Sequence, residues 1–360
     1  MAMTPRELEL LARRLEPAIR RAFEQAIAAI RAEAEVQSLA DMVRAGQVDA
    51  LLAALGFDEA RLSPVAEAVR QAFVAGADAE IKNLPALSLK QRIRGSYNPI
   101  SNTPVLRFGF DMRNPVVESW LRENASRLVT GIISDQRHLI SGVLRQGMIA
   151  GRNPRQTALE IVGRIGETGR RSGGLVGLTA QQGQFVANVR AQLASGDPKQ
   201  MAAYFARNRR DKRLDGIVKR AITAGKPVSQ ADIDKIAGRY SDRLLALRGE
   251  MIARTESITA MNAGREESYR QQIEAGVLAP ENVTGTWSAT NDRRVRHSHH
   301  AMNGQRRQFG QPFQTPSGAL MNHPGDTSFG AGPEEIIGCR CVKQYRINLT
   351  AEVVRGNEVR

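Results

Sequence analysis

Residues 240–276 read YSDRLLALRGEMIARTESITAMNAGREESYRQQIEAG, and this stretch decides the fold class. Its apolar side chains recur at helical spacing along a single stripe, formed by Leu244, Leu247, Met251, Ile258, Met261, Tyr269 and Ile273. Gly276 is placed to end the helix, since glycine readily adopts the left-handed conformation that closes a last turn. The pattern predicts one long helix from about Tyr240 to Gly276.

Arg254 falls on that apolar stripe, between Met251 and Ile258. A buried arginine must find a partner or extend its head to solvent, because an unpaired buried charge is very unfavourable. We therefore expect Arg254 to form a structural ion pair, or to bond the carbonyls of the segment that follows the helix. A catalytic or phosphate-binding role is the less favoured interpretation.

The sequence before this helix repeats one helix-start signal, a small polar residue followed by proline. The pairs are Thr4-Pro5, Ser63-Pro64, Asn114-Pro115, Asn153-Pro154 and Asp197-Pro198. The polar side chain can accept a first-turn N–H, and the fixed φ of proline suits the first helical position. Capping boxes are further predicted at Thr4 with Glu7 and at Thr179 with Gln182, and another start at Ser229. Helices are predicted as far as about residue 277.

Two irregular stretches interrupt the predicted helices. Residues 83–114 carry prolines, glycines and an alternating segment at 105–110, which predicts a loop with one short strand. Residues 166–177 are rich in glycine but fit neither of the glycine patterns that bind phosphate next to a strand. We interpret them as a flexible connector in preference to a phosphate cradle.

Beyond Gly276 the period changes from helical to alternating. Residues 283–290 alternate, and residues 339–347 (CRCVKQYRI) are rich in strand formers. The predicted class is mainly α, an elongated multi-helix N-terminal and central region followed by a small α+β C-terminal module. The predicted regions are a variable helical region at 1–110, a helical region with the long final helix at 111–277, the module at 280–347 and a flexible tail at 348–360.

The chain is strongly basic, with 51 Lys and Arg against 37 Asp and Glu and a formal charge of +14. Such an excess attracts polyanions, so double-stranded DNA or an acidic protein surface is the expected neighbour. A basic surface without a particular partner is the alternative. The densest stretch offers five candidate phosphate contacts: Arg207, Arg209, Arg210, Lys212 and Arg213. Exposed helix faces also carry such charges without binding anything.

No apolar run approaches the roughly 18 residues that a membrane span needs, and the first residues lack the apolar core of a signal peptide. We expect no membrane span and a protein that begins in a cytoplasm. The two cysteines, Cys339 and Cys341, fit a reducing compartment, because one intervening residue does not favour a normal disulfide.

Histidines and cysteines gather near the end of the chain. Imidazole nitrogen and thiolate sulfur are ligands that tetrahedral zinc accepts, so a structural zinc site is one interpretation. Its candidate ligands are His299, Cys339 and Cys341, completed by His323, Asp292 or Asp326. The spacing is not that of a zinc finger. The other interpretation is a basic, His-rich loop and two buried cysteines that pack beside Trp287.

No catalytic residue is assigned, because the sequence holds neither an H-E-x-x-H helix nor a G-x-S-x-G elbow. We therefore do not expect an enzyme. The alternative is a metal-dependent nuclease that acts on nucleic acid through the His-rich loop, with His297, His299, His323 and Asp326 as its candidate residues.

Five motifs follow one another from the long helix to the end of the module. They are Ile252-Ala253-Arg254-Thr255-Glu256 with Ala260, Asn262, Ala263 and Gly264; the run from Trp287 to Arg296; His299 with Asn303-Gly304; His323-Pro324-Gly325-Asp326; and Cys339-Arg340-Cys341. In this order, over about residues 130–345, the chain resembles the phage Mu F-like minor head protein family of phage head morphogenesis.

The resemblance implies a minor capsid protein of a tailed bacteriophage, associated with the portal and involved in head assembly and in DNA packaging or delivery. Its implied partners are the portal protein, a scaffold or major capsid protein, and double-stranded DNA bound without sequence preference. Its implied place is the virion, after assembly in the host cytoplasm.

The family pattern falls on a set of structural and ligand-type residues: Arg254, Glu256, Asp292, Arg296, His299, Gly304, Pro324, Asp326, Cys339 and Cys341. Either His299 or His300 can occupy the histidine position of the family, and counting back from Gly304 favours His299.

Overall fold

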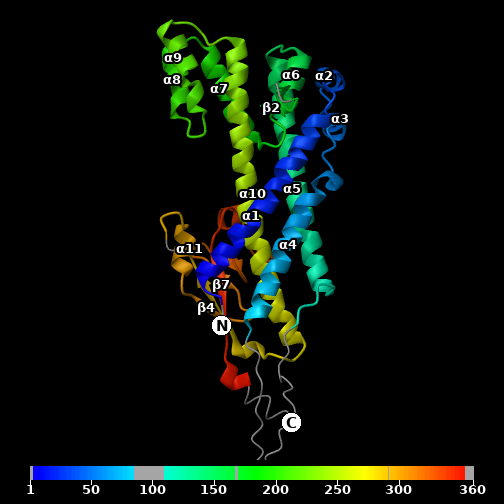
Figure 1. Ribbon diagram of the computed structural model, residues 1–360, viewed down its shortest axis with the longest axis vertical. Coiled ribbons are helices and arrows are strands. Elements are labelled where there is room, and N and C mark those ends of the chain that lie inside the picture. The colour runs from blue at the N-terminus through cyan, green and yellow to red at the C-terminus, as the bar shows by residue number, and fades with distance from the viewer. Residues whose placement is uncertain (1–2, 85–108, 167–168, 291, 353–360) are drawn as a thin grey trace, which may run out of the picture. The chain divides into compact units, whose positions relative to one another are not determined.

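The computed structural model describes residues 3–84, 109–166, 169–290 and 292–352, and this part of the chain is chiefly helical with a small α+β C-terminal part (Figure 1). The predicted fold class is therefore confirmed. The long helices are α1 (Pro5–Glu33), α4 (Glu59–Asn83), α5 (Pro115–Ile149), α7 (Ala180–Ala194) and α10 (Gln230–Glu274). The shorter ones are α2 (Val36–Arg44), α3 (Val48–Ala54), α6 (Pro154–Val162), α8 (Pro198–Ala202), α9 (Asp215–Thr223), α11 (His297–Met302) and α12 (Pro333–Ile336), with 3-10 turns η1 (Ala203–Ala206), η2 (Lys212–Leu214) and η3 (Pro280–Asn282).

Most of the predicted helix starts are confirmed, together with their caps. Thr4 and Glu7 form the predicted capping box at the start of α1, and Thr179 and Gln182 form another at the start of α7. The side chains that precede proline accept a first-turn N–H at the starts of α5, α6 and α8, at distances of 2.8, 2.9 and 2.8 Å. These signals succeed because the capping side chain and the N–H that donates to it lie within three residues of each other.

The start predicted at Ser63-Pro64 is wrong, because Pro64 lies inside α4. The helix begins at Glu59, after Asp58 accepts the N–H of Arg61 at 2.8 Å. Proline has no N–H for the carbonyl four residues earlier, that of Ala60. The hydroxyl of Ser63 donates to this carbonyl at 2.7 Å, so the helix passes the proline with the carbonyl satisfied.

The predicted long helix belongs to a single helix of 45 residues, α10, which starts ten residues earlier than predicted. Ser229 accepts the N–H of Asp232 at 3.2 Å, so the two starts that the sequence offered, at Ser229 and near Tyr240, belong to one helix. After Glu274 the chain turns at Gly276, whose φ of 69° is the left-handed conformation expected of a terminating glycine.

The chain falls into two compact units, each built from separate segments. Unit 1 contains residues 1–19, 67–122 and 251–360, and unit 2 contains residues 20–66 and 123–250. The four consecutive regions that the sequence predicts describe composition along the chain and remain a prediction. Within the described residues we find no helix with the length and apolarity needed to span a membrane.

The centre of unit 1 is the part of α10 that begins at Met251, which is buried on nearly all sides although it carries many polar residues. One apolar cluster joins Leu8 and Ala12 of α1 to Ile258 and Met261 of α10 and to Val342. The helices α4 and α10 cross at two glycines. A Cβ on Gly76 would lie 2.3 Å from the carbonyl oxygen of Met261, and a Cβ on Gly264 would lie 2.0 Å from that of Phe73.

The C-terminal part of unit 1 holds short antiparallel strands. The strands are β3 (Val283–Ser288), β4 (Arg306–Gln308), β5 (Phe313–Gln314), β6 (Leu320–Met321) and β7 (Val342–Ile347). Strand β3 is central in a sheet of order β4-β3-β7, with Gly285 opposite Arg307 on one side and Tyr345 on the other. The strands predicted at 283–290 and 339–347 are thus confirmed over residues 283–288 and 342–347. A second core packs Trp287, Met302, Phe313, Met321, Ile336 and both cysteines together.

In unit 2 the glycine-rich segment is packed against the helices, so the flexible connector predicted at 166–177 is wrong for its described part. Strand β2 (Arg171–Ser172), within this segment, pairs antiparallel with β1 (Arg164–Ile165), which directly precedes it. The following residues, 175–178, are buried. Buried Arg31 donates to the carbonyls of Gly174 and Val176 at 2.7 and 2.6 Å, and Arg248 donates to that of Gly177 at 2.9 Å.

Two predictions concern segments that the structure describes only in part. The short strand predicted at 105–110 lies mostly outside them. The flexible tail predicted from residue 348 differs from the structure as far as residue 352, because the buried carboxylate of Glu352 accepts the N–H of Ala279 at 2.7 Å and a side-chain N–H of Asn282 at 3.1 Å.

Candidate metal centre and nucleic-acid interface

His299 is buried, with 1% of its surface exposed, whereas its neighbours His297 and His300 are exposed. It lies on the short helix α11 and not in a loop as predicted. The helix turns one histidine inward, where its ring packs edge-on against Trp287 with ring centres 5.1 Å apart. Of the two histidines that the family position left open, His299 is thus the one placed inside the module.

Cys339 and Cys341 lie on the turn between α12 and β7, and both are buried with free thiols. The strand predicted at 339–347 does not include them, because β7 begins only at Val342. Their side chains nevertheless converge. The Sγ atoms of Cys339 and Cys341 lie 3.4 and 3.5 Å from Nδ1 of His299. All three ligand-type atoms lie within 4.8 Å of one another.

The two thiols titrate as a pair. The pKa of Cys339 lies well below its usual value, first because Cys341 hydrogen-bonds to it and then because His299 does. The pKa of Cys341 is raised by that same bond and by burial, since Cys341 keeps the proton that the pair shares.

A buried carboxylate faces the other nitrogen of the histidine ring. Oε2 of Glu335, on α12, lies 3.1 Å from Nε2 of His299, although the angle is not that of a hydrogen bond. Glu335 is held by the hydroxyls of Ser298 at 2.8 Å and Ser317 at 3.3 Å. Sequence reasoning missed Glu335, because no pattern links it to a histidine 36 residues earlier.

The other predicted metal ligands are not part of this group. The carboxylate of Asp292 accepts two hydrogen bonds from Arg340, both at 2.6 Å. His323 is buried near Glu266 and Asp326, and its Nδ1 lies 3.2 Å from the carbonyl oxygen of Pro324. The structure thus brings together three of the six candidate ligands. Among the described residues, His297 and Asp326 do not join His299 in a ligand group either, so the residue set considered for a nuclease is not assembled.

Several motif residues attach the module to α10. The backbone oxygen of Pro324 accepts from Asn262 at 3.2 Å, and Gly325 turns with a φ of 88° directly over Thr259. The hydroxyl of Thr255 accepts the N–H of Gly338, next to Cys339, at 2.9 Å. The side chain of Arg296 donates to the carbonyl of Ile337, in the same turn. These contacts place the cysteine-bearing turn against the long helix.

The role predicted for Arg254 is taken by Arg265, which lies three helical turns further along and on the same face. Arg254 is 36% exposed and lies 3.8 Å from Glu16, a distant ion pair. Arg265 is buried, donates to Glu80 at 2.6 Å and donates to the carbonyl of Lys343 at 2.6 Å. Nearby, Lys343 donates to the buried carboxylate of Glu266 at 2.6 Å. Four charged groups therefore fix β7 to α10 and α4.

In unit 2, the basic stretch predicted to contact phosphates is largely engaged with other side chains. Arg207 donates to Gln192, Arg210 pairs with Asp215 at 3.1 Å, and Arg213 pairs with Asp211 at 2.7 Å. Arg209 lies 3.9 Å from Glu250, and Lys212 is exposed. A phosphate would have to compete with these internal partners for most of the stretch.

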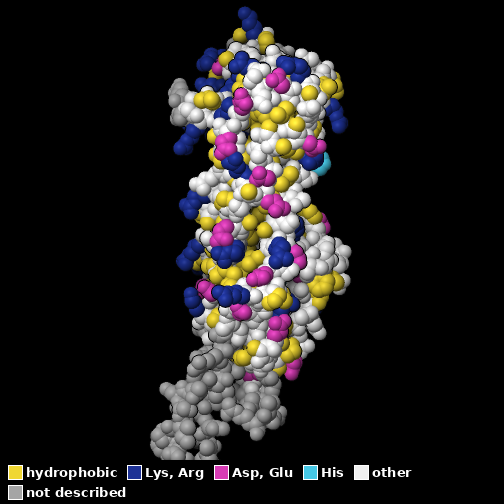
Figure 2. Space-filling view, turned by 90° about the vertical axis from the view of Figure 1, so that its right-hand side faces the viewer, with side chains coloured by type: hydrophobic (Ala, Val, Ile, Leu, Met, Phe, Trp, Pro, Cys, Tyr) yellow, Lys and Arg dark blue, Asp and Glu magenta, His cyan; other side chains and the backbone are white. Residues whose placement is uncertain are grey.

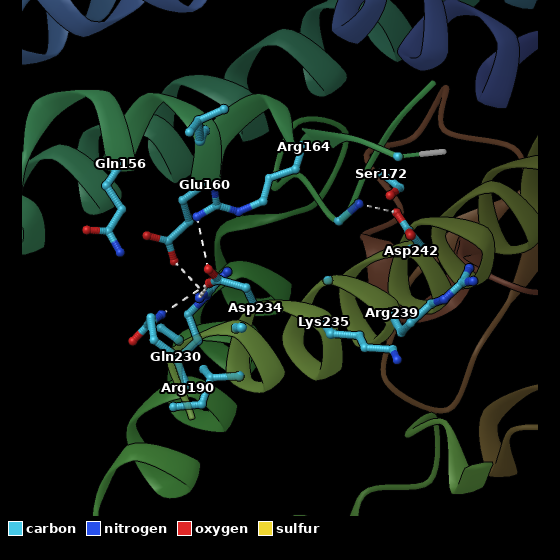
Figure 3. Close-up of a pocket in the computed structure, with 18 of the residues that line it drawn as sticks. Gln156, Glu160, Arg164, Ser172, Arg190, Gln230, Asp234, Lys235, Arg239 and Asp242 are labelled. Carbon is cyan, nitrogen blue, oxygen red and sulfur yellow. Dashed lines mark hydrogen bonds and ion pairs between the residues drawn. The ribbon is translucent and has the colours of Figure 1, made fainter. Parts of the chain in front are cut away.

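A basic pocket of about 900 Å³, also in unit 2, was not predicted from sequence. Figure 3 shows that α6, α7, α10 and the β1-β2 hairpin contribute its side chains. Its lining includes six cations against three carboxylates: Arg152, Arg164, Arg170, Arg190, Lys235 and Arg239 against Glu160, Asp234 and Asp242. Arg164 and Arg190 pair with Asp234 at 2.9 and 2.5 Å.

Three cations that line this pocket do not pair with its carboxylates. Within the described part of the chain, Arg170, Lys235 and Arg239 form no ion pair, and all three are exposed. In Figure 3, Lys235 and Arg239 extend from successive turns of α10 without a marked contact. On the face drawn in Figure 2, by contrast, Lys and Arg alternate with Asp, Glu and apolar side chains. The pocket is thus a local concentration of unpaired positive charge.

Comparison with known families supports the resemblance noted in the sequence. Residues 212–344 match the model of a family described as Phage Mu protein F like protein. Over these residues the chain is therefore similar to a family of phage head morphogenesis proteins. The match begins in η2 and ends in β7, so it includes α10, the His299, Cys339 and Cys341 group, and the buried charges. No curated protein and no solved structure matches the chain.

Proposed function

We propose that the protein is a portal-associated minor capsid protein of a tailed bacteriophage that takes part in head assembly. The observation that carries the proposal is the match of residues 212–344 to the Mu F-like family. Every structural motif on which the resemblance depends has a contact that explains it, such as Gly264 at the helix crossing and Pro324 on Asn262. We infer that the protein assembles with the portal and with a scaffold or major capsid protein in the host cytoplasm, and then remains in the virion.

We further propose that the protein binds double-stranded DNA without sequence preference during packaging or delivery. The support is the formal charge of +14 and the basic pocket with its unpaired Arg170, Lys235 and Arg239. Contacts of lysine and arginine with phosphates position a protein on DNA but do not read its sequence. The stretch from Arg207 to Arg213 remains a second candidate surface, weakened by its internal pairs.

Mass spectrometry of purified virions and proheads tests the assembly proposal. We expect the chain in both particles at a copy number far below that of the major capsid protein, and we expect the portal protein to co-purify with it. Absence from virions and proheads alike would overturn the proposal. Cleavage of plasmid DNA in Mg²⁺, Mn²⁺ or Zn²⁺ that His299→Ala abolishes would replace it with a metal-dependent nuclease.

A further inference from the structure

We propose that His299, Cys339 and Cys341 bind one zinc ion through Nδ1 and the two Sγ atoms, with a water molecule as the fourth ligand. The site goes beyond the assembly role proposed above and does not depend on it. Its purpose would be structural, since it would join α11 to the turn before β7.

The distances between the donor atoms fit zinc geometry. Zinc binds sulfur at about 2.3 Å and imidazole nitrogen at about 2.0–2.1 Å, so a tetrahedral site separates nitrogen from sulfur by about 3.6 Å. The two separations here are 3.4 and 3.5 Å. Both nitrogen–sulfur separations therefore agree with a tetrahedral site to within about 0.2 Å, and all three donor atoms lie within 4.8 Å of one another.

Glu335 prepares the histidine for this role. A metal-binding histidine usually directs its second ring nitrogen at a carboxylate, which fixes the tautomer and the orientation of the ring. Nε2 of His299 lies 3.1 Å from the Glu335 carboxylate, and a proton on this nitrogen would leave Nδ1 free to bind the metal beside the two sulfurs. The hydroxyls of Ser298 and Ser317 hold that carboxylate in place. Glu335 is thus a positioning residue and does not contact the metal.

A small cavity beside the three ligands leaves room for the fourth. It has a volume of about 10 Å³ and is lined by His299, Cys339 and Cys341 together with Thr290 and Arg296. A volume on the order of 10–15 Å³ holds one water molecule. The cavity can therefore hold the water molecule that completes the coordination of the zinc ion.

The surroundings of the site show why a metal would matter. The core of the module is small, and its centre is formed by the edge-on contact of Trp287 with His299 and by the two cysteines. A domain of such size gains little stability from apolar burial alone. A metal bond between segments 40 residues apart would stabilise the folded module directly.

The test uses the full chain, purified without chelator and dialysed against excess zinc and then against metal-free buffer. Elemental analysis should find about one zinc per chain, and His299→Ala, Cys339→Ser and Cys341→Ser should each lose it. The matched control is His300→Ala, which removes the exposed neighbour on the same helix and should keep the metal. A wild-type chain without zinc, or Cys341→Ser with full zinc content, would overturn the proposal.

Two measurements protect the test against variants that fail to fold. Cobalt substitution of the wild-type chain should give thiolate-to-cobalt charge transfer and the intense visible bands of a tetrahedral site. Glu335→Gln should fold, as checked by circular dichroism, yet bind zinc about 10–100-fold more weakly in a chelator competition. Its control, Glu334→Gln, changes the exposed neighbour and should bind as the wild type does. An octahedral cobalt spectrum, or equal zinc affinity of the two glutamine variants, would contradict the assigned geometry.

Discussion

Arg340 places its guanidinium against the carboxylate of Asp292, with two hydrogen bonds of 2.6 Å, and it is the residue between the two cysteines. The pKa of Asp292 is lowered, chiefly by these bonds and next by the N–H of Arg294. A bidentate ion pair therefore connects the motif that contains Asp292 with the motif that contains the two cysteines.

We expect Asp292→Asn and Arg340→Ala to lower the melting temperature of unit 1 by similar amounts, and the double variant to lower it little further. The reason is that either change removes the same pair. The coupling should shrink between low salt and about 1 M salt, because exposed charges are screened over about 3 Å there. Thermal melts of the wild type, the two single variants and the double variant at both salt concentrations measure this coupling. Fully additive changes in melting temperature would refute the pairing.

Gly264→Ala should destabilise unit 1 by about 1–3 kcal/mol, because the new Cβ would lie 2.0 Å from a backbone oxygen of α4. Gly76→Ala should do the same from the other side of the crossing. Gly131→Ala is the matched control, since it lies within α5 with open space around its Cβ position and should stabilise the chain by about 0.5–1 kcal/mol. Urea unfolding measures the free energy of unfolding of the three variants. An unchanged value for Gly264→Ala would show that the helix crossing can widen.

Lys343→Met should cost about 3–5 kcal/mol, because it leaves the carboxylate of Glu266 buried without its cation. Adding Glu266→Gln to this variant should recover part of the loss, since the uncompensated charge is then gone. The exposed Arg346→Met on the same strand is the control and should change little. A double variant less stable than Lys343→Met would show that Tyr345, which also donates to Glu266, matters more than the charge.

Asp326 should contribute to stability at neutral pH and lose that contribution in acid. Burial disfavours its charged form, but His323 and the N–H groups of Ser328 and Asn322 outweigh burial and hold its pKa below the ordinary value. A depressed folded-state pKa stabilises the chain above the unfolded pKa, about 3.9 for aspartate, and the contribution fades as pH falls through the folded value. Asp326→Asn should therefore lose about 1.5–3 kcal/mol near pH 7.

The difference between wild type and Asp326→Asn should narrow steadily as the pH is lowered below about 4. Unfolding by urea at a series of pH values measures this difference, and other carboxylates cancel because both chains carry them. Glu281→Gln, at an exposed position, controls for the loss of one negative charge. A gap that stays constant into acid would mean that the asparagine fails for steric reasons.

Neutralising Arg170, Lys235 and Arg239 to glutamine should lower the slope of log affinity against log salt by about two to three, at roughly 0.9 for each phosphate that the protein no longer neutralises. Changing Arg207, Arg210 and Arg213 in the same way tests the stretch predicted from sequence. Because these three already have internal partners, we expect a smaller change in slope. Binding of a short DNA duplex at several salt concentrations checks both, and equal slopes for wild type and the pocket variant would remove the pocket from the interface.

The sequence allowed those features to be predicted whose causes are local. Asn153 and Thr179 predicted their helices because each capping side chain accepts an N–H only two or three residues further along the chain. The convergence of His299 with the cysteines was also predicted, although from the order of motifs and from an incorrect strand assignment. The Ser63 prediction failed because a hydroxyl can satisfy the carbonyl that proline leaves free.

The remaining features depend on contacts between distant parts of the chain. Arg254 and Arg265 share one face of α10, and only packing against Glu80 decides which of them is buried. Glu335 carries no local sign of its role beside His299. The basic pocket collects cations between residues 152 and 239 from several helices, and no short window of sequence shows such a concentration.

The bond between Lys343 and Glu266 spans 77 residues, and this has a consequence for the chain during its synthesis. At about 5–20 residues per second, Glu266 leaves the ribosome about 4–15 seconds before its cation does. All residues of unit 2 have been made by then, since that unit ends at Glu250. The nascent chain should therefore contain all of unit 2 while unit 1 is still incomplete. During this time unit 1 should expose apolar surface, and the carboxylate of Glu266 should remain in water. This interval is when the chain depends most on chaperones.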